Sequence, residues 1–230
     1  QNRGVLCFVA TGRSRFEIAT EHLLDGLQFD GYLTNNGQIV YDGSWNLLRT
    51  VAMVPDEVRA LVDYCDERSL PLWLVSEQRS RFNYHFNDRV PVVMAEIHTE
   101  IPERCDLHTM LQEPVVKAVM FLTAQEVREG PLSFMPHARS TQWFIHGQDI
   151  IPAEGGKLPA MRFMAEANSW SPDELMAFGD SENDNEMLRY AGTGVAMGNA
   201  LEETKAASDY VTDDCDDEGV AHALAHFALI

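Results

Sequence analysis

The sequence contains no hydrophobic run long enough to cross a membrane. A membrane-spanning helix needs about 20 consecutive apolar residues, and no run in these 230 residues approaches that length. The opening stretch GVLCFVATG is too short, and too lightly flanked by positive charge, to be a secretory signal. Its β-branched residues are instead typical of a buried strand. We therefore expect a protein without a membrane-spanning segment.

Positive charge is also scarce. The 17 lysine and arginine residues are outnumbered by 36 aspartate and glutamate residues, so that the formal net charge is −19 at pH 7. Because such a chain repels phosphate backbones and anionic lipids, nucleic acids and membrane surfaces are poor partners for it. The remaining composition, 45% hydrophobic and 23% charged, is ordinary for a folded globular protein and excludes disorder, collagen and coiled coil as descriptions of the whole chain.

Cysteine is rare and dispersed. The four cysteines, Cys7, Cys65, Cys105 and Cys215, lie far apart and form no C-x-x-C pair. This spacing argues against a disulfide framework or a zinc site, and it suits reduced thiols in a cytoplasmic protein.

The length and the order of the predicted elements indicate two kinds of structure. A chain of 230 residues exceeds the usual single domain and falls short of two. Strands and helices alternate in both terminal parts, which predicts a doubly wound, Rossmann-like parallel sheet with helices on both faces. The middle third changes character and reads as a small α+β unit. We therefore expect an α/β core formed by residues 1–53 and 152–230, interrupted by an inserted α+β cap domain at residues 54–151.

Several segments of this arrangement have clear patterns. Val5–Ala10 reads as a fully buried strand, and a helix with Phe16, Ile18, Leu23 and Leu24 as core contacts is expected after it. Residues 55–69 have the pattern of an amphipathic helix with proline in its first turn. Strands are expected at residues 31–33, 38–41, 47–53, 70–75, 81–86, 115–122, 141–146, 175–178, 194–197 and 210–212. Residues 87–112 give no clear assignment.

The segment LMAFGDSENDNEML carries the strongest chemical signal. An apolar strand delivers Asp180 to its carboxyl end, which is where open α/β sheets place their sites, and Asn183 and Asp184 follow at the start of the next helix. Two carboxylates at one strand end repel each other unless a cation lies between them, and oxygen ligands suit Mg²⁺. Helix capping is the alternative, because Ser, Asp and Asn are preferred there, but it does not account for Asp180.

Three further places could bind an anion. Lys157 follows two glycines and precedes a helix, where the helix dipole disfavours a positive charge; a bound anion would explain it, and a surface lysine is the alternative. Thr11-Gly12 lies at a strand–helix junction, where a hydroxyl and free N–H groups can hold phosphate, although threonine is also a common helix cap. Asn35-Asn36-Gly37 is read most simply as a hairpin turn.

With these residues the chain resembles the haloacid dehalogenase-like phosphatase superfamily, in particular its Cof-type sugar-phosphatase branch. The resemblance rests on FVATGR, which ends at Arg13, on LTNNGQIV, which contains Asn36, on the region of Lys157, and on GDSENDNEML with the sequence that follows it to Leu224. The middle third is similar only in size, position and alternation of elements.

The resemblance implies an activity and a set of residue roles. In this family a metal-bound aspartate attacks the phosphoryl group to form an aspartyl-phosphate, which water then hydrolyses. By position, Thr11 and Gly12 would hold the phosphoryl oxygens, and Lys157 would neutralise the nucleophile and the phosphate. The remaining implied roles are Mg²⁺ ligation by Asp180, orientation of the metal or its waters by Asp184, and substrate contacts from Asn183 and Asn36.

The sequence departs from the family pattern in two ways. Gly-Gly precedes Lys157, whereas family members usually have glycine after the lysine, and the first motif, Asp-x-Asp-Gly-Thr, is absent. This motif supplies the nucleophile and the general acid/base. We expect it on the central strand, one βα unit of roughly 30 residues ahead of Thr11. The natural protein would then begin earlier than Gln1, and the 230-residue chain alone would be inactive.

The resulting expectation is a Mg²⁺-dependent phosphatase of small phosphorylated metabolites. We expect a small-molecule phosphate ester as its partner, a monomer or weak homodimer in solution, and substrate selection by the cap. The alternatives are a catalytically inactive relative that binds a phosphorylated ligand or protein through the same fold, and a phosphomutase of the same superfamily.

Overall fold

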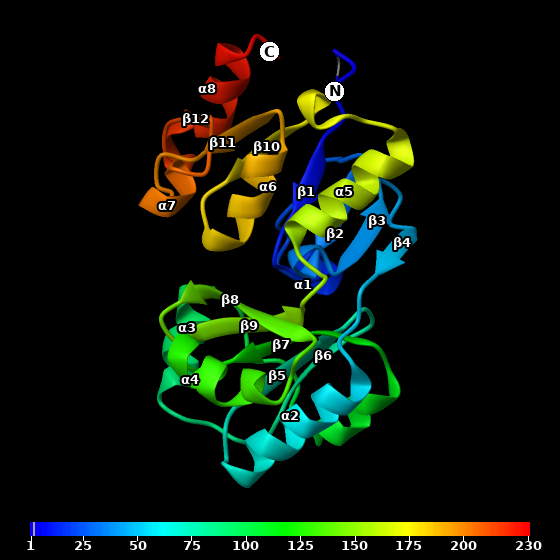
Figure 1. The fold of residues 1–230 in the computed structure, drawn as a ribbon, viewed down its shortest axis with the longest axis vertical. Helices are drawn as coiled ribbons and strands as arrows, with labels where there is room; N and C mark the ends of the chain where they lie inside the picture. Colours follow the sequence, from blue (N-terminus) through cyan, green and yellow to red (C-terminus); the bar gives the residue numbers. More distant parts are fainter. Residues whose placement is uncertain (2) are drawn as a thin grey trace.

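The computed structural model describes residues 1 and 3–230, and its strands form three sheets in two parts (Figure 1). The upper part of Figure 1 holds a four-stranded and a three-stranded sheet, and the lower part holds a five-stranded sheet. The strands are β1 (Phe8–Ala10), β2 (Gly31–Thr34), β3 (Ile39–Asp42), β4 (Leu47–Thr50), β5 (Leu72–Ser76), β6 (Ser80–Phe82), β7 (Val115–Met120), β8 (Ala138–Phe144), β9 (Gly147–Pro152), β10 (Met176–Gly179), β11 (Thr193–Ala196) and β12 (Tyr210–Val211).

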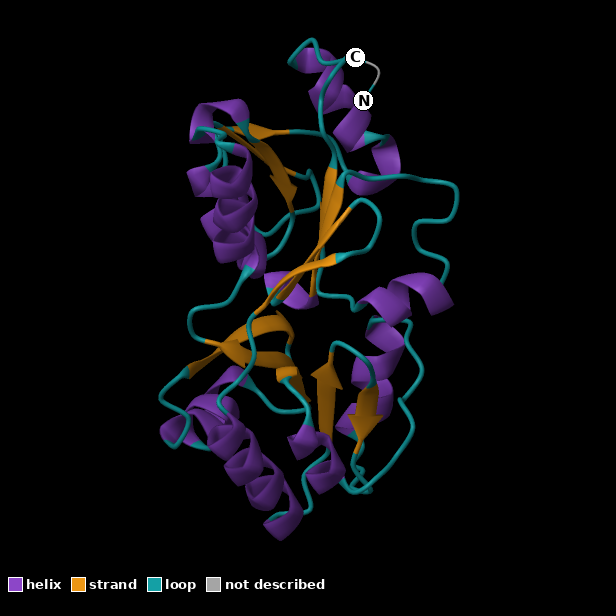
Figure 2. Cartoon of the chain, turned by 90° about the vertical axis from the view of Figure 1, so that its right-hand side faces the viewer, coloured by secondary structure: helices purple, strands orange, loops and turns teal. Residues whose placement is uncertain are grey.

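Helices lie around these sheets, as the side view shows (Figure 2). The α-helices are α1 (Arg15–Thr20), α2 (Pro55–Glu67), α3 (Arg89–Glu96), α4 (Ala124–Glu129), α5 (Lys157–Asn168), α6 (Asn185–Tyr190), α7 (Glu202–Lys205) and α8 (Gly219–His226). Within the described part of the chain, no helix is long and apolar enough to cross a membrane. All four cysteines are free thiols.

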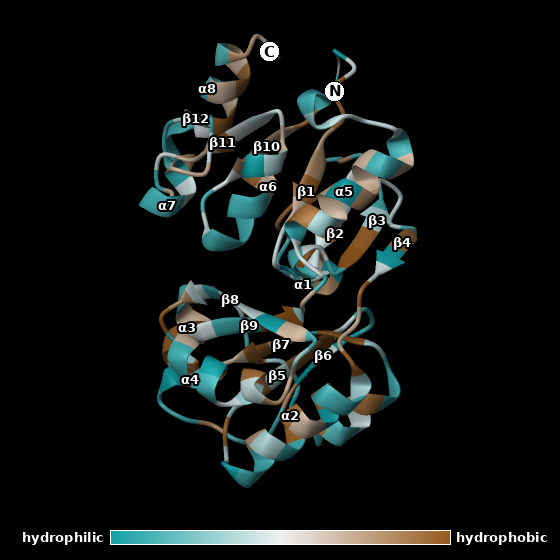
Figure 3. Cartoon of the chain, viewed as in Figure 1, coloured by the Kyte–Doolittle hydropathy of each residue, from teal (hydrophilic) through white to brown (hydrophobic). Residues whose placement is uncertain are grey.

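The upper part contains the parallel strands expected of an α/β fold. Strands β10, β11 and β12 are parallel, and β1 is parallel to β2. Strands β3 and β4 extend the second sheet in antiparallel fashion, in the order β1-β2-β3-β4. The predicted α/β fold class is thus confirmed, with an antiparallel extension in the core. Figure 3 shows a hydrophobic stretch along β3, where Ile39, Val40 and Tyr41 are buried.

The prediction of a fully buried first strand is wrong. Strand β1 covers only Phe8–Ala10, its three residues are half-buried, and Leu6 is 51% exposed. The reason is that β1 pairs with β2 on one side only, and no other strand of residues 1 and 3–230 pairs with its second edge. Leu23 is also exposed, because helix α1 ends at Thr20 and leaves Leu23 in the turn that follows. Ile18 is buried as expected.

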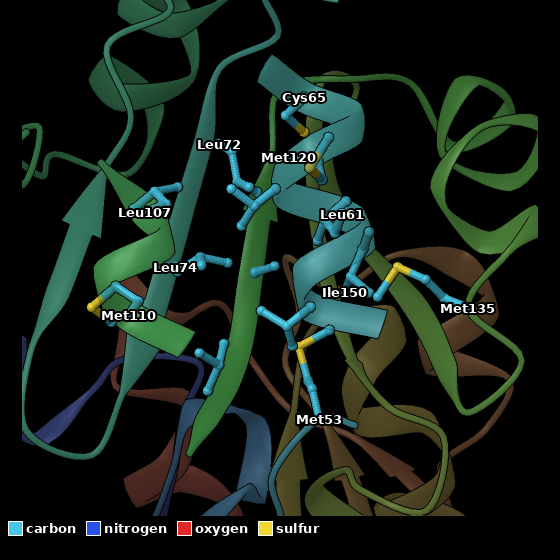
Figure 4. Close-up of a cluster of buried hydrophobic side chains, with 14 of the residues drawn as sticks. Met53, Leu61, Cys65, Leu72, Leu74, Leu107, Met110, Met120, Met135 and Ile150 are labelled. Carbon is cyan, nitrogen blue, oxygen red and sulfur yellow. The ribbon is translucent and has the colours of Figure 1, made fainter. Parts of the chain in front are cut away.

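The five-stranded sheet is antiparallel throughout, with the order β6-β5-β7-β9-β8. Helix α2 begins at Pro55 and buries Val58, Leu61, Val62 and Cys65, as its pattern predicts. These residues pack on one face of the sheet against side chains of β5, β7 and β9 (Figure 4). The region without a sequence assignment contains α3, and strand β9 escaped prediction because polar residues interrupt its hydrophobic pattern.

The other face of the five-stranded sheet is turned toward the upper part. Trp73, Val75 and Val119 of this sheet belong to the same buried cluster as Tyr32 and Tyr41 of the upper sheet. The two parts are therefore joined by a continuous hydrophobic contact. The cavity described next is lined from both sides of this contact.

Candidate active site

A cavity of about 240 Å³ lies where strands β1 and β10 end. Thr11 and Asp180, the residues that follow these two strands, both line it, as expected for an α/β sheet whose strands place functional groups at their carboxyl ends. The lining residues are Thr11, Gly12, Arg13, Glu17, Asn36, Trp73, Ile97, Lys117, Val119, Trp143, Asp149, Lys157, Asp180, Ser181 and Asn183.

A buried ion pair forms one wall. The Nζ atom of Lys157, the first residue of α5, lies 2.6 Å from Oδ1 of Asp184. The other carboxylate oxygen of Asp184 accepts hydrogen bonds from the backbone N–H groups of Asp180 and Ser181, at 3.1 and 3.2 Å. A lysine at a helix N-terminus opposes the helix dipole, and the carboxylate of Asp184 offsets this. Lys157 is therefore no surface lysine.

Position 179, at the end of β10, requires glycine. A Cβ atom at Gly179 would lie only 2.7 Å from Cγ of Asp184, which is closer than real Cβ contacts. Gly179 thus allows the Asp184 side chain to fold back over the end of β10. Ser181 and Asp184 also form a capping box, so the capping alternative accounts for Asp184.

Asp180 and Asn183 line the cavity and carry side-chain oxygen atoms. Asp180 is exposed, and the side-chain contact that its carboxylate makes is with Oγ of Ser181, at 3.3 Å. The Nδ2 atom of Asn183 donates to Oδ1 of Asn36 at 3.0 Å, while Oδ1 of Asn183 is buried without a hydrogen-bond partner in the described structure. Because a buried, unsatisfied oxygen is costly, this atom is suited to meet a ligand.

Carboxylate and amide oxygens are the ligand types that Mg²⁺ prefers. The carboxylate of Asp180 and the unpaired Oδ1 of Asn183 line the same cavity and supply this chemistry. The side chains present therefore fit a hard divalent cation. Both carboxylate oxygens of Asp184 already have partners, Lys157 and two backbone N–H groups. Asp184 therefore orders the site through these contacts.

Thr11 and Gly12 form the strand end opposite Asp180. The backbone N–H of Arg13 donates to Oγ1 of Thr11 at 3.1 Å, which leaves the hydroxyl hydrogen of Thr11 free to donate to a ligand. The capping alternative fails for this residue, because the N-cap of α1 is Ser14, in a capping box with Glu17.

Asn36 is positioned by a turn with left-handed backbone. It lies between β2 and β3 with φ 60° and ψ 29°, a conformation that asparagine tolerates better than most residues. The turn interpretation is correct, and the side chain also bridges the two parts: Nδ2 of Asn36 donates to Oδ2 of Asp149 at 2.7 Å. Gly37, with φ 84°, packs directly against Gly156 and Ala160 at the start of α5.

The structure thus brings the predicted residues to one place. Six line the cavity, and Asp184 lies directly behind Lys157; the six are Thr11, Gly12, Asn36, Lys157, Asp180 and Asn183.

Five cavity residues from the five-stranded sheet escaped sequence analysis: Trp73, Lys117, Val119, Trp143 and Asp149. Lys117 is the residue that could have revealed this contribution from the sequence. It interrupts the apolar strand VVKAVM, and charged residues are rarely buried unless they are paired.

Comparison with known proteins gives a consistent result. Residues 1–224 match the family described as haloacid dehalogenase-like hydrolase. YkrA of Bacillus subtilis (strain 168) is 28% identical over 230 residues, covering all of this chain and 87% of YkrA. The 5-amino-6-(5-phospho-D-ribitylamino)uracil phosphatase YcsE of the same organism is 25% identical over 237 residues, covering all of this chain and 84% of YcsE.

A solved structure matches the fold closely. The structure of the subclass IIB sugar phosphatase BT4131 superposes with a TM-score of 0.85 at 28% identity, covering all of this chain and 88% of that one. The chain belongs to the haloacid dehalogenase-like hydrolase family, and the resemblance predicted from its motifs is confirmed.

Proposed function

We propose that the protein is a phosphatase that hydrolyses small phosphate esters with the help of Mg²⁺. The observation that carries this proposal is that three groups line one cavity. They are the buried Lys157, the free hydroxyl of Thr11 at the end of β1, and the exposed carboxylate of Asp180 at the end of β10. Relatives that are named phosphatases support the same activity.

Four residues would bind the phosphoryl group, and we call Thr11, Gly12, Lys157 and Asn183 the phosphate cradle. The hydroxyl of Thr11 and the backbone N–H of Gly12 would donate to phosphoryl oxygens, and the ammonium of Lys157 would neutralise their charge. Asp184 would hold Lys157 in place through its 2.6 Å contact. Such fixed donors stabilise the charge that develops as the phosphoryl group is transferred.

Asp180 would hold the cation, with Asn183 available as a second oxygen donor. When bound, Mg²⁺ neutralises negative charge on the transferring group and helps to orient it. The exposed carboxylate of Asp180 is free to serve this purpose, because its contact with Ser181 is long, at 3.3 Å.

We place the nucleophile on a further strand between β1 and β10. Each of these strands pairs on one edge only within residues 1 and 3–230, and both end at the cavity. A carboxylate oxygen there would attack phosphorus as the P–O bond to the leaving group breaks and a neighbouring acid protonates the leaving oxygen. Water would then cleave the aspartyl-phosphate and release inorganic phosphate.

The part of the chain between the two halves of the core would act as the cap. We infer that residues 54–151 exclude water from the cavity and contact the leaving group, through Trp73, Val119 and Trp143. Indole rings pack on the apolar faces of sugars and on flat heteroaromatic rings. Both a sugar phosphate and a phosphorylated ribityl compound are therefore suitable substrates, in keeping with the names of BT4131 and YcsE.

The test is a phosphatase assay on the full-length protein. Release of inorganic phosphate from a panel of sugar, nucleotide and polyol phosphates would be measured with Mg²⁺ and with a chelator. Thr11→Val should lower kcat by roughly a hundredfold, as expected for the loss of one preorganised donor. Thr20→Val, at an exposed position in α1, is the matched control and should leave kcat unchanged. Metal-independent turnover, or equal kcat for both variants, would contradict the proposal.

A further inference from the structure

A second buried ion pair faces the phosphate cradle from the five-stranded sheet. Nζ of Lys117 lies 3.5 Å from Oδ2 of Asp149, and the two residues are 5% and 4% exposed. They come from neighbouring strands, where Asp149 pairs directly with Val119, so the charges lie on a diagonal of the sheet. Burying two charges is unfavourable unless further hydrogen bonds satisfy them. Their other contacts are therefore informative.

The lysine reaches the strand end that holds Thr11. Nζ of Lys117 donates to the carbonyl oxygen of Gly12 at 2.9 Å. The N–H of the same peptide group belongs to Arg13 and donates to Oγ1 of Thr11 at 3.1 Å. Because a peptide group is planar, holding its oxygen also fixes the direction of its N–H. By holding the Gly12 carbonyl, Lys117 thus helps to fix the Arg13 N–H that occupies one side of the Thr11 hydroxyl oxygen.

The aspartate reaches the other side of the cradle. Oδ2 of Asp149 accepts from Nδ2 of Asn36 at 2.7 Å, and Oδ1 of Asn36 accepts from Nδ2 of Asn183 at 3.0 Å. Nε1 of Trp143 donates to the second oxygen of Asp149 at 3.1 Å and fixes the carboxylate. Through Asn36 the carboxylate fixes the amide of Asn183, whose Nδ2 keeps a second hydrogen that can be donated to a phosphoryl oxygen.

We propose that Lys117 and Asp149 are positioning residues that order the phosphate cradle when the cap lies over it. The inference rests on the proposed function and deepens it: one ion pair of the cap would align Thr11 through Gly12, and Asn183 through Asn36. The Lys117 ammonium donates a hydrogen bond to the Gly12 carbonyl and forms an ion pair with Asp149. This favours a role in positioning over direct recognition of the leaving group. Cap closure and completion of the cradle are then one event.

The experiment uses inorganic phosphate, which has no leaving group, as the probe. Its dissociation constant would be measured by calorimetry on the full-length protein with Mg²⁺ present. The double variant Lys117→Met/Asp149→Asn removes the bond to Gly12 without leaving a buried, unpaired charge, and its new amide can still accept from Asn36. We expect its phosphate Kd to rise at least tenfold. We also expect kcat to fall by a similar factor for every ester, whatever its leaving group.

Two further variants make the result decisive. Lys117→Met alone, in which Asp149 keeps its bonds from Asn36 and Trp143, tests the bond to Gly12 separately and has the same expected outcome. Thr99→Val removes a hydrogen bond between the cap and the Arg13 side chain, but no bond to the cradle, and should leave the phosphate Kd unchanged. Circular dichroism would verify the fold of each variant.

Three results would overturn the proposal. If the variants bind phosphate as tightly as the wild type, and only the KM values of certain esters rise, then Lys117 and Asp149 recognise the leaving group instead. An equal loss of phosphate affinity in Thr99→Val would assign the effect to general weakening of the contact between cap and core. A wild type that neither binds phosphate nor hydrolyses esters would refute the proposed function, and this inference with it.

Discussion

Nζ of Lys157 and Oδ1 of Asp184 lie 2.6 Å apart, with only 8% and 3% of these residues exposed. The contact joins the start of α5 to the loop after β10, two segments that are distant in sequence and that line the same cavity. Because the carboxylate also accepts two backbone N–H bonds, the lysine and this loop are held as one unit. The site therefore depends on this pair for its stability as well as for its charge.

Asp184→Asn should be strongly destabilising. It leaves Lys157 buried without a counter-charge, and breaking a buried pair in this way costs about 3–5 kcal/mol. Urea denaturation would measure the free energy of unfolding, with Asp173→Asn at an exposed position as the control. A loss of less than about 1 kcal/mol, the usual range of an exposed ion pair, would show that the pair is not buried in solution.

Asp180→Asn should weaken Mg²⁺ binding and leave the fold intact. Asp180 is exposed, so its charge contributes little to stability, but it is the carboxylate that we assign to the cation. Calorimetric titration with Mg²⁺ in the absence of substrate measures this directly. Glu182→Gln changes an exposed carboxylate in the same loop and should have little effect. Equal Mg²⁺ affinity in the Asp180 variant and the wild type would rule out the assignment.

These two aspartates show how far the sequence could predict the site. A glycine and an aspartate at a strand end, with a second carboxylate four residues later, pointed to the loop that lines the cavity. The difference between the two carboxylates could not be predicted in the same way. It depends on which of them folds back over Gly179 toward Lys157, and Lys157 lies 27 residues away.

The contribution of the five-stranded sheet could not be predicted for a similar reason. Lys117 and Asp149 become neighbours only through the register of β7 against β9, and β9 itself was not predicted. Its polar residues Gln148 and Asp149 break the hydrophobic pattern that reveals a strand. Local patterns predicted helix α2 and the turn at Asn36, because those elements depend on residues close in sequence.

Gly37→Ala should destabilise the protein more than Gly26→Ala. The two glycines have similar positive φ angles, 84° and 78°, so that the backbone strain of alanine is nearly the same at both positions. At Gly37 a Cβ atom would also lie 2.8 Å from Cβ of Ala160, whereas at Gly26 it would meet nothing within 4 Å. We expect a difference of about 1–3 kcal/mol in the free energy of unfolding, the usual cost of overpacking. Equal losses would show that Gly37 is not in close contact with α5.

The contact between Arg89 and Glu126 should make the stability depend on acidic pH. The bidentate pair, with distances of 2.7 and 3.1 Å, lowers the pKa of Glu126 from 4.5 to about 2, mainly through the hydrogen bonds from Arg89 and also through those from Thr123. A carboxyl whose pKa is depressed in the folded state stabilises the protein above its unfolded pKa. This stabilisation is lost as the pH falls from about 4.5 to about 2.

Arg89→Met should therefore reduce stability at pH 7 and have progressively less effect as the pH falls. Because Glu126 is 42% exposed, screening by solvent limits the effect at pH 7 to about 1 kcal/mol. The free energy of unfolding of both proteins would be measured by urea denaturation at intervals between pH 7 and pH 2.5. Arg128→Met, in the last turn of α4, is the control for loss of a positive charge. A difference between wild type and Arg89→Met that stays constant over this range would mean that the ion pair does not set the ionisation of Glu126.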